Sequence, residues 1–428
     1  MDVKVILINI DTEDRFGLSG TNWVPPLGLV ALSSYLKNSG YEIKIFDSMI
    51  EKLDTLEQKV LNISDEYTIA GFYTSFLNYQ NVLTFAEKLK QKGVKIVIGG
   101  PYASSMKFQI LKNRDFIDLV IFGEGEEALL SYLEGKPLKE IPNIAYKQNG
   151  EIIINKYKKF DINNSCLDYT LISLEKYQER FRKKNNTFKA PVSYYAHKGC
   201  SWKRCIFCAI PYKSPQRKDP KFVWDELKEL HELFRIDYIY ETGESFTDNI
   251  AWLIELVNSK SINLSWEIFG RADMIQKETA RLLKELGVYK VFIGVETANL
   301  NLLKYLKKSS TPKDVKEAIS LLKSFEINVV PSFMCGVLKE TEDTLKETLY
   351  LAKEIKDICQ SNEVLVFPMT PIPGSPAFKM LKEKCKKYSN RDLFDIEELQ
   401  NDWYKNFCYV DSEAVYHYVK EIKNVFQD

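Results

Sequence analysis

The sequence predicts an α/β protein with an N-terminal doubly wound, Rossmann-like domain, a partial (β/α)6 TIM-type barrel and a helical C-terminal cap. Two observations predict this fold class. Short apolar runs typical of buried strands alternate with amphipathic helical stretches up to about Leu133, and the alternation begins again at Pro191. The last part of the chain, residues 378–428, has helical periodicity and many aromatic residues.

The N-terminal region begins with an apolar run, Val3–Ile10, which reads as a buried parallel strand. Residues 25–40 follow as an amphipathic helix that ends at a glycine. Further strands are expected at 41–47, 67–75, 94–100 and 119–126, with helices at 55–63, 79–92, a short one after 100 and one through Leu133. In a doubly wound fold the carboxyl ends of these strands form the edge that binds ligands.

A hairpin follows at residues 141–156, because Asn149-Gly150 can supply the positive φ angles of a type I′ turn between two strand-like runs. The stretch after it is charged. We therefore expect residues 1–138 to form the first domain and residues 139–190 to form a hairpin and connector.

The barrel is expected over residues 191–377. Its six strands are expected at 190–200, 238–245, 264–273, 288–297, 328–336 and 363–374, with a helix after each of the first five. In β/α barrels the chemistry lies at the carboxyl ends of the strands. Residues 378–428 would form the cap.

Composition limits the class of partner. Fifty-nine basic residues balance fifty-nine acidic ones, so no net field attracts nucleic acid or an anionic membrane, and a small-molecule or peptide substrate is favoured. The N-terminal sequence does not resemble a signal peptide, and no apolar run of about twenty residues is present. Eight cysteines without a secretion signal suggest metal binding in a reducing, cytoplasmic compartment.

The most informative motif is a loop that contains Cys200, Cys205 and Cys208 at C-x4-C-x2-C spacing. No fourth thiolate lies nearby. A [4Fe–4S] cluster held by three thiolates keeps one iron free, which suits the anchoring of S-adenosylmethionine. The alternatives are a zinc site with His197 as fourth ligand, or three buried cysteines without a metal.

This pattern resembles the radical S-adenosylmethionine enzymes, specifically the class with an N-terminal cobalamin-binding domain. That family typically has C-x3-C-x2-C with an aromatic residue before the last cysteine, as Phe207 precedes Cys208 here. The first gap in this chain is one residue longer. The resemblance implies a [4Fe–4S] cluster, S-adenosylmethionine and cobalamin as cofactors.

Three charged residues stand at successive strand ends, and the positions of Glu244 and Glu296 match positions that bind S-adenosylmethionine in the resembled family. Glu244 would contact its amino group and Glu296 the ribose hydroxyls. Arg271 offers a planar fork suited to the methionine carboxylate, with a salt bridge at the top of the barrel as the alternative. A carboxylate that follows an apolar run, as Glu296 does, is costly unless it is paired or binds a ligand.

The loops at the N-terminal strand ends resemble those that surround cobalamin, although their glycines taken alone indicate only tight turns. The resemblance implies contacts from Pro26, Leu27, Gly28, Thr74, Ser75, Gly99, Gly100, Pro101, Tyr102, Gly123, Glu124, Gly125 and Glu126. The loop from Asp11 to Gly20 contains no histidine, so the cobalt should have no histidine ligand. Copies of this domain that bind no cobalamin are the alternative.

The resemblance implies that a 5′-deoxyadenosyl radical removes a hydrogen atom from an unactivated carbon, to which cobalamin supplies a methyl group. The function expected is therefore that of a radical methyltransferase, although no side chain is identified as catalytic. Rearrangement or cyclisation without methyl transfer is one alternative, and a non-catalytic cobalamin or iron–sulfur sensor is another. A reductant such as flavodoxin or ferredoxin is the implied partner.

Overall fold

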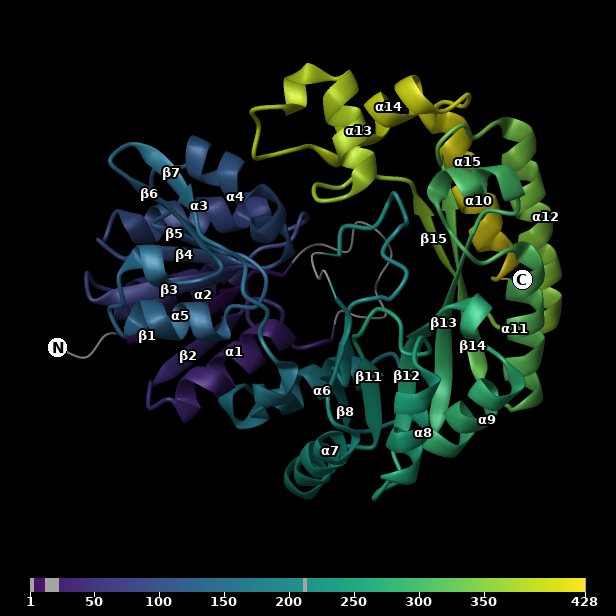
Figure 1. Ribbon diagram of the computed structural model, residues 1–428, viewed down its shortest axis with the longest axis horizontal. Helices are drawn as coiled ribbons and strands as arrows, with labels where there is room; N and C mark the ends of the chain where they lie inside the picture. Colours follow the sequence, from purple (N-terminus) through teal and green to yellow (C-terminus); the bar gives the residue numbers. More distant parts are fainter. Residues whose placement is uncertain (1–3, 12–22, 211–213, 428) are drawn as a thin grey trace. The chain divides into compact units, whose positions relative to one another are not determined.

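The computed structural model describes residues 4–11, 23–210 and 214–427, and the chain forms two compact units (Figure 1). The first unit contains Met1–Asn186 and Lys387–Leu393, and the second contains Thr187–Lys386 and Phe394–Asp428. Among the described residues, no helix combines the length and apolar character needed to cross a bilayer.

The first unit is built on a seven-stranded sheet with the strand order β2-β1-β3-β4-β5-β6-β7. Its strands are β1 (Lys4–Asn9), β2 (Ile43–Asp47), β3 (Thr68–Tyr73), β4 (Lys95–Gly99), β5 (Leu119–Ile121), β6 (Ile144–Gln148) and β7 (Glu151–Ile154). Its helices are α1 (Leu27–Asn38), α2 (Leu53–Ile63), α3 (Tyr79–Lys90), α4 (Pro101–Asn113), α5 (Glu126–Leu133) and α6 (Leu174–Arg182). Strands β1 to β5 are parallel, which confirms the predicted doubly wound domain.

Both faces of this sheet are buried, which explains why β1 is a continuous apolar run rather than an alternating one. Leu7 of β1 packs in one cluster with Leu29 of α1 and Leu129 of α5. Because crossovers between parallel strands are right-handed, α1 lies on the face opposite to α2, α3 and α4. The packing thus holds the carboxyl ends of β1 to β5 along one edge.

The hairpin predicted around Asn149-Gly150 is present, with φ angles of 53° and 83° at these two residues. Its strand β6 pairs antiparallel with β5, so the hairpin extends the sheet of the first unit. The connector region therefore contributes two strands to the N-terminal sheet.

Residues Lys387–Leu393 also belong to the first unit, although they lie far along the chain. Asp392 is buried and receives two hydrogen bonds from the Arg114 guanidinium, at 2.7 and 3.1 Å, and one from the Tyr79 hydroxyl at 2.7 Å. The Tyr102 hydroxyl donates to the backbone oxygen of Asp392. A buried carboxylate with these partners anchors the segment firmly.

The second unit contains a six-stranded parallel sheet with the order β15-β14-β13-β12-β11-β8. Its strands are β8 (Pro191–Tyr194), β11 (Tyr238–Glu241), β12 (Ser265–Gly270), β13 (Val288–Glu296), β14 (Asn328–Cys335) and β15 (Leu365–Pro368), with a separate ladder of β9 (His197–Lys198) and β10 (Gln216–Arg217). The helices between them are α7 (Pro220–Phe234), α8 (Ile250–Asn258), α9 (Lys277–Leu286), α10 (Leu300–Leu306), α11 (Pro312–Ser324) and α12 (Glu342–Cys359). This arrangement confirms the predicted partial barrel.

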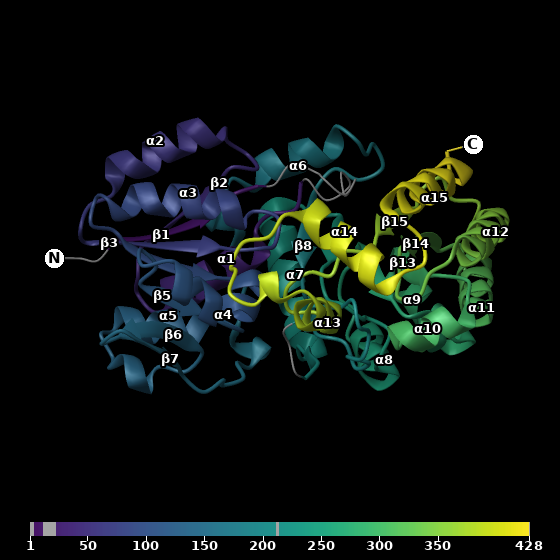
Figure 2. The same cartoon turned by 90° about the horizontal axis from the view of Figure 1, so that it is seen from above.

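Three helices follow the last strand: α13 (Pro376–Lys384), α14 (Ile396–Phe407) and α15 (Ser412–Val425). Helix α15 lies beside α12 and packs against β14 and β15, so it covers the outside of the last two strands (Figure 2). Helix α14 lies at the carboxyl end of β14, where the Trp403 indole donates to the Gly336 oxygen at 2.9 Å. The predicted C-terminal helices are confirmed.

Candidate functional site

The cysteine loop connects the two short strands β9 and β10, whose antiparallel pairing closes it at its base. Its middle is held by backbone hydrogen bonds from Ile206 N to Leu306 O at 3.1 Å and from Ala377 N to Ile206 O at 2.8 Å. Two chain segments distant in sequence therefore fix the part of the loop between Cys205 and Cys208. Residues 211–213 of the loop lie outside the described residues.

The three thiols are neighbours in the structure. Burial raises the pKa of Cys205 to about 12 and raises that of Cys208, and the charge of Cys200 acts on both. Iron–sulfur clusters are bound by thiolates, so three neighbouring thiols are a donor set that fits such a cluster. The cluster would have to keep these thiols ionised, because burial favours their protonated form. Among the described residues, no three His, Cys, Asp or Glu side chains are grouped as ligands of a single metal ion.

His197, at the base of the loop, is buried and engaged by the protein. Its Nε2 atom accepts a hydrogen bond from Ser245 N at 3.0 Å, so the ring proton belongs on Nδ1. Nδ1 lies 3.1 Å from Glu241 Oε1. Because the ring is buried and its Nε2 already accepts from the backbone, that nitrogen is not free to act as the fourth ligand of a zinc site.

Glu244 follows β11 and contacts the cysteine loop directly. Its Oε2 accepts a hydrogen bond from Gly199 N, the residue before Cys200. Burial raises the pKa of Glu244, and the Gly199 N–H acts in the opposite direction. The structure thus brings this predicted site residue to the cysteines.

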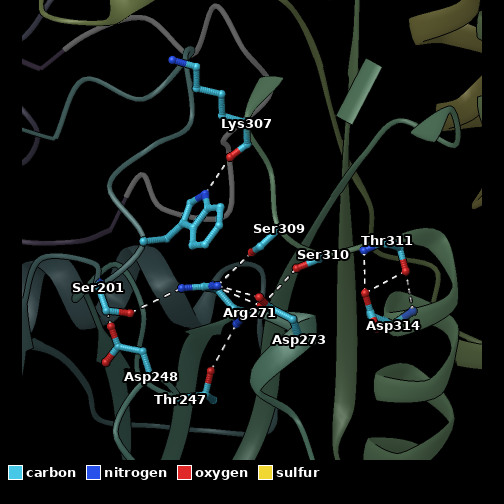
Figure 3. A network of polar contacts seen from close by, with 11 residues as sticks. Ser201, Thr247, Asp248, Arg271, Asp273, Lys307, Ser309, Ser310, Thr311 and Asp314 are labelled. Atoms are coloured by element: carbon cyan, nitrogen blue, oxygen red, sulfur yellow. Dashed lines mark hydrogen bonds and ion pairs between the residues drawn. The ribbon is translucent and has the colours of Figure 1, made fainter. Parts of the chain in front are cut away.

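Arg271 is part of a polar network around the same loop (Figure 3). Its Nη2 donates to Asp273 Oδ2 at 2.6 Å and to Ser309 Oγ at 2.8 Å, and its Nε donates to Asp273 Oδ1 at 3.2 Å. The guanidinium carbon lies 5.2 Å from the ring centre of Trp202. The geometry corresponds to the salt bridge considered as the alternative role for Arg271.

Glu296 ends β13 at a register shift and has a φ of 64°, a conformation uncommon for a non-glycine residue. Its Oε1 accepts a hydrogen bond from Lys308 Nζ at 2.8 Å. The pair lies across Gly294, where a β-carbon would stand 2.4 Å from Glu296 Oε1 and 2.7 Å from Lys308 Nζ. Among the described residues Glu296 Oε2 has no hydrogen-bond donor. One carboxylate oxygen is therefore positioned and the other is available.

Three of the loops predicted to bind cobalamin are joined to one another in the first unit. The Thr74 hydroxyl donates to Gly99 O at 2.7 Å and accepts from Ala103 N at 3.1 Å, while Gly123 N donates to Ser104 Oγ at 3.0 Å. The Thr74 side chain is thus satisfied internally.

Among the other residues predicted to contact cobalamin, some side chains are buried, whereas some glycines have open space beside them. Tyr102 and Glu124 are buried, and Glu124 Oε2 accepts from the Tyr157 hydroxyl at 3.1 Å. In contrast, among the residues that the structure describes, no neighbouring atom would lie within 4 Å of a β-carbon at Gly28, and only one, at 3.8 Å, would do so at Gly99. This open space beside backbone at the strand-end edge fits a large ring that approaches closely. The loop from Asp11 to Gly20, predicted to lack a cobalt ligand, lies outside the described residues after Asp11.

Comparison with known families agrees with this geometry. Residues 194–352 match the Radical SAM superfamily, and residues 18–133 match the B12 binding domain. The first match contains the cysteine loop, Glu244, Arg271 and Glu296, and the second contains the strand-end loops of the first unit. The chain is a cobalamin-dependent radical SAM enzyme. Its family uses a [4Fe–4S] cluster and S-adenosylmethionine, and its B12 binding domain implies cobalamin.

Several relatives of this radical SAM enzyme span most of its length. It is 25% identical to an uncharacterized methyltransferase of Pyrococcus horikoshii, over 91% of this chain and 87% of that protein. It is 26% identical to the anaerobic magnesium-protoporphyrin IX monomethyl ester cyclase of Rubrivivax gelatinosus, over 92% and 72% of the two chains.

Solved structures show the same fold. The cobalamin-dependent S-adenosylmethionine radical enzyme OxsB has a TM-score of 0.75 at 18% identity, and the match covers 97% of this chain but 66% of OxsB. The radical S-adenosylmethionine methyltransferase TsrM of Kitasatospora setae has a TM-score of 0.72 at 17% identity, over 91% of this chain and 79% of that one.

Sequence reasoning about this radical SAM enzyme did not identify Lys308 or the contact of His197 with Ser245. Lys308 follows α10 in a run of polar residues, which resembles an ordinary solvated helix end. Its burial depends on the fold of the cysteine loop. No spacing signal in the sequence distinguishes it from the exposed Lys307 beside it.

Proposed function

We propose that this radical SAM enzyme is a methyltransferase that acts on an unactivated carbon of a small molecule or peptide. The observation that carries the proposal is the similarity, along 91% of the chain, to the methyltransferase of Pyrococcus horikoshii. Both the cysteine loop and the B12 binding domain lie within the chain, so the groups needed for radical formation and methyl supply would be present together.

When bound, the cluster and S-adenosylmethionine supply a 5′-deoxyadenosyl radical, and cobalamin supplies a methyl group. The chain's own residues bind and orient these groups. In this proposal the three thiolates of the cysteine loop hold the cluster, Glu244 accepts hydrogen bonds from the methionine ammonium, and Glu296 Oε2 accepts from the ribose. The loops at the ends of β3, β4 and β5 offer backbone and small residues to cobalamin.

A reaction without methyl transfer is the second candidate, favoured by the comparable similarity to the Rubrivivax gelatinosus cyclase. The fold and the proposed site residues serve both reactions, because each needs the same radical. The two candidates differ in the use of a second S-adenosylmethionine as methyl donor. Radical SAM enzymes also need a reductant, for which we propose a flavodoxin or ferredoxin.

The test uses the anaerobically reconstituted protein with cobalamin, S-adenosylmethionine and titanium(III) citrate as reductant. We expect both 5′-deoxyadenosine and S-adenosylhomocysteine, the second in at least the molar amount of bound cobalamin, because donation of a methyl group leaves S-adenosylhomocysteine. Formation of 5′-deoxyadenosine alone would favour the candidate without methyl transfer. Absence of both products would refute both candidates.

A further inference from the structure

We infer that Lys308 binds the methionine carboxylate of S-adenosylmethionine and that Arg271 instead stabilises the cysteine loop. The inference rests on the proposed binding of S-adenosylmethionine at this loop. It follows from four features of the second unit: the backbone position of Lys308, the free donors of its ammonium group, the commitment of Arg271, and the arrangement of charge beside the cysteine loop.

The backbone just before Lys308 is held against the cysteine loop at two points. Ile206 N donates to Leu306 O at 3.1 Å, and the Trp202 indole donates to Lys307 O at 2.6 Å. These contacts hold the residues before Lys308 against the chain between the first and third cysteines. The position of Lys308 is therefore set by the same loop that would carry the cluster.

The side chain of Lys308 is largely buried, with 13% of its surface exposed, whereas Lys307 is exposed. Burial acts to lower the pKa of Lys308, but the Glu296 carboxylate raises it above its usual value, so the amine is charged. An ammonium group has three donors, and among the described residues only Glu296 Oε1 accepts from this one. A buried cation with donors to spare favours an anionic ligand.

Arg271 has no comparable capacity. Three of its hydrogen bonds go to Asp273 and Ser309, and its Nη1 lies 3.4 Å from Ser201 Oγ (Figure 3). Its guanidinium also lies against the Trp202 ring. Removing it from this network to bind a ligand would leave the Asp273 carboxylate without its cationic partner, which is costly for a partly buried group.

The charges beside the cysteine loop complement those of an amino acid. Glu244 Oε2 accepts a hydrogen bond from Gly199 N, next to Cys200, and Lys308 follows Leu306, whose oxygen accepts from Ile206 N between Cys205 and Cys208. The methionine part of S-adenosylmethionine has one ammonium and one carboxylate group. Glu244 matches the first and Lys308 matches the second, and charge-assisted hydrogen bonds of this kind are the strong ones.

The experiment compares the binding of S-adenosylmethionine and its decarboxylated analogue to cluster-loaded protein by anaerobic equilibrium dialysis. In the wild type the analogue should bind more weakly. The dissociation constant of the analogue divided by that of S-adenosylmethionine should fall at least about tenfold in Lys308→Met, because this variant cannot bind the carboxylate through residue 308. Lys308→Arg should retain most of the wild-type ratio.

Lys307→Met is the matched control, since it makes the same substitution at the exposed neighbour, and its ratio should equal that of the wild type. Iron content shows whether each variant holds the cluster. If Lys308→Met loses iron, Lys308→Gln replaces it, because glutamine can still donate to Glu296. The inference is wrong if the variant at Lys308 has the wild-type ratio, or if Lys307→Met lowers the ratio as much as the variant at Lys308 does. Failure of the wild type to bind S-adenosylmethionine would instead refute the proposed site as a whole.

Discussion

The contact of Gly243 with His197 gives the sharpest test of how the protein supports the cysteine loop. A β-carbon at Gly243 would stand 2.1 Å from His197 Cε1, 2.4 Å from Nδ1 and 2.6 Å from Nε2. Carbon atoms in contact normally stand at least about 3.5 Å apart, so Gly243→Ala would force the ring to move by about 1.4 Å. The ring is buried beside Phe246 and Trp252, which leaves little space for that movement.

Two costs follow from this displacement. Overpacking of a dense interior typically costs about 1–3 kcal/mol. The ring also loses its hydrogen bond from Ser245 N, and a buried N–H left unpaired costs about 1–3 kcal/mol more. We therefore expect Gly243→Ala to lower the free energy of unfolding of the second unit by about 2–6 kcal/mol.

Urea unfolding of the iron-free protein, followed by tryptophan fluorescence, measures this change. Five of the six tryptophans belong to the second unit, so the signal reports mainly on that unit. Gly28→Ala is the control, because no neighbouring atom of the described residues lies within 4 Å of the added carbon, and it should unfold at or slightly above the wild-type urea concentration. If Gly243→Ala and the wild type unfold at the same urea concentration, the argument from the His197 contact is wrong.

Four further outcomes are expected. Alanine at all three positions of the cysteine loop should abolish iron binding and the visible absorption of the cluster after reconstitution, whereas Cys166→Ala should retain both; iron analysis and absorption spectra decide this. Electron paramagnetic resonance of the cob(II)alamin form should show no nitrogen coupling from a protein imidazole, and clear coupling would contradict the expected ligation. Glu296→Gln should weaken S-adenosylmethionine binding about ten- to hundredfold and reduce 5′-deoxyadenosine formation while iron and cobalamin contents are unchanged; equal affinity would return Glu296 to a purely structural role as the partner of Lys308. Burial raises the pKa of Glu340 to about 7, so the stability that its protonated form contributes should be complete below about pH 4.5 and lost by about pH 7. The free energy of unfolding should fall by on the order of 3 kcal/mol over this range. Urea unfolding at pH 5 and pH 8 measures the loss, which Glu340→Gln should not show.

The sequence alone identified the features that depend on local patterns. The alternation of apolar and amphipathic stretches determined the order of strands and helices in both units, because strand and helix periods are written into neighbouring residues. The turn at Asn149-Gly150 was predictable because few other residues tolerate its φ angles. The spacing of the three cysteines predicted a cluster-binding loop because all three thiols lie in one short stretch of the sequence.

The tertiary structure decided which charged residues meet. Lys308 reaches Glu296 only because β13 has a register shift at its end and Gly294 leaves room for the pair. Arg271 is paired with Asp273 and braced by Ser309, a choice that depends on the path of two loops. Asp392 lies in the segment Lys387–Leu393, which belongs to the N-terminal unit although the chain on either side of the segment belongs to the other one. Contacts of this kind depend on strand register and loop path over long separations, which no local periodicity encodes.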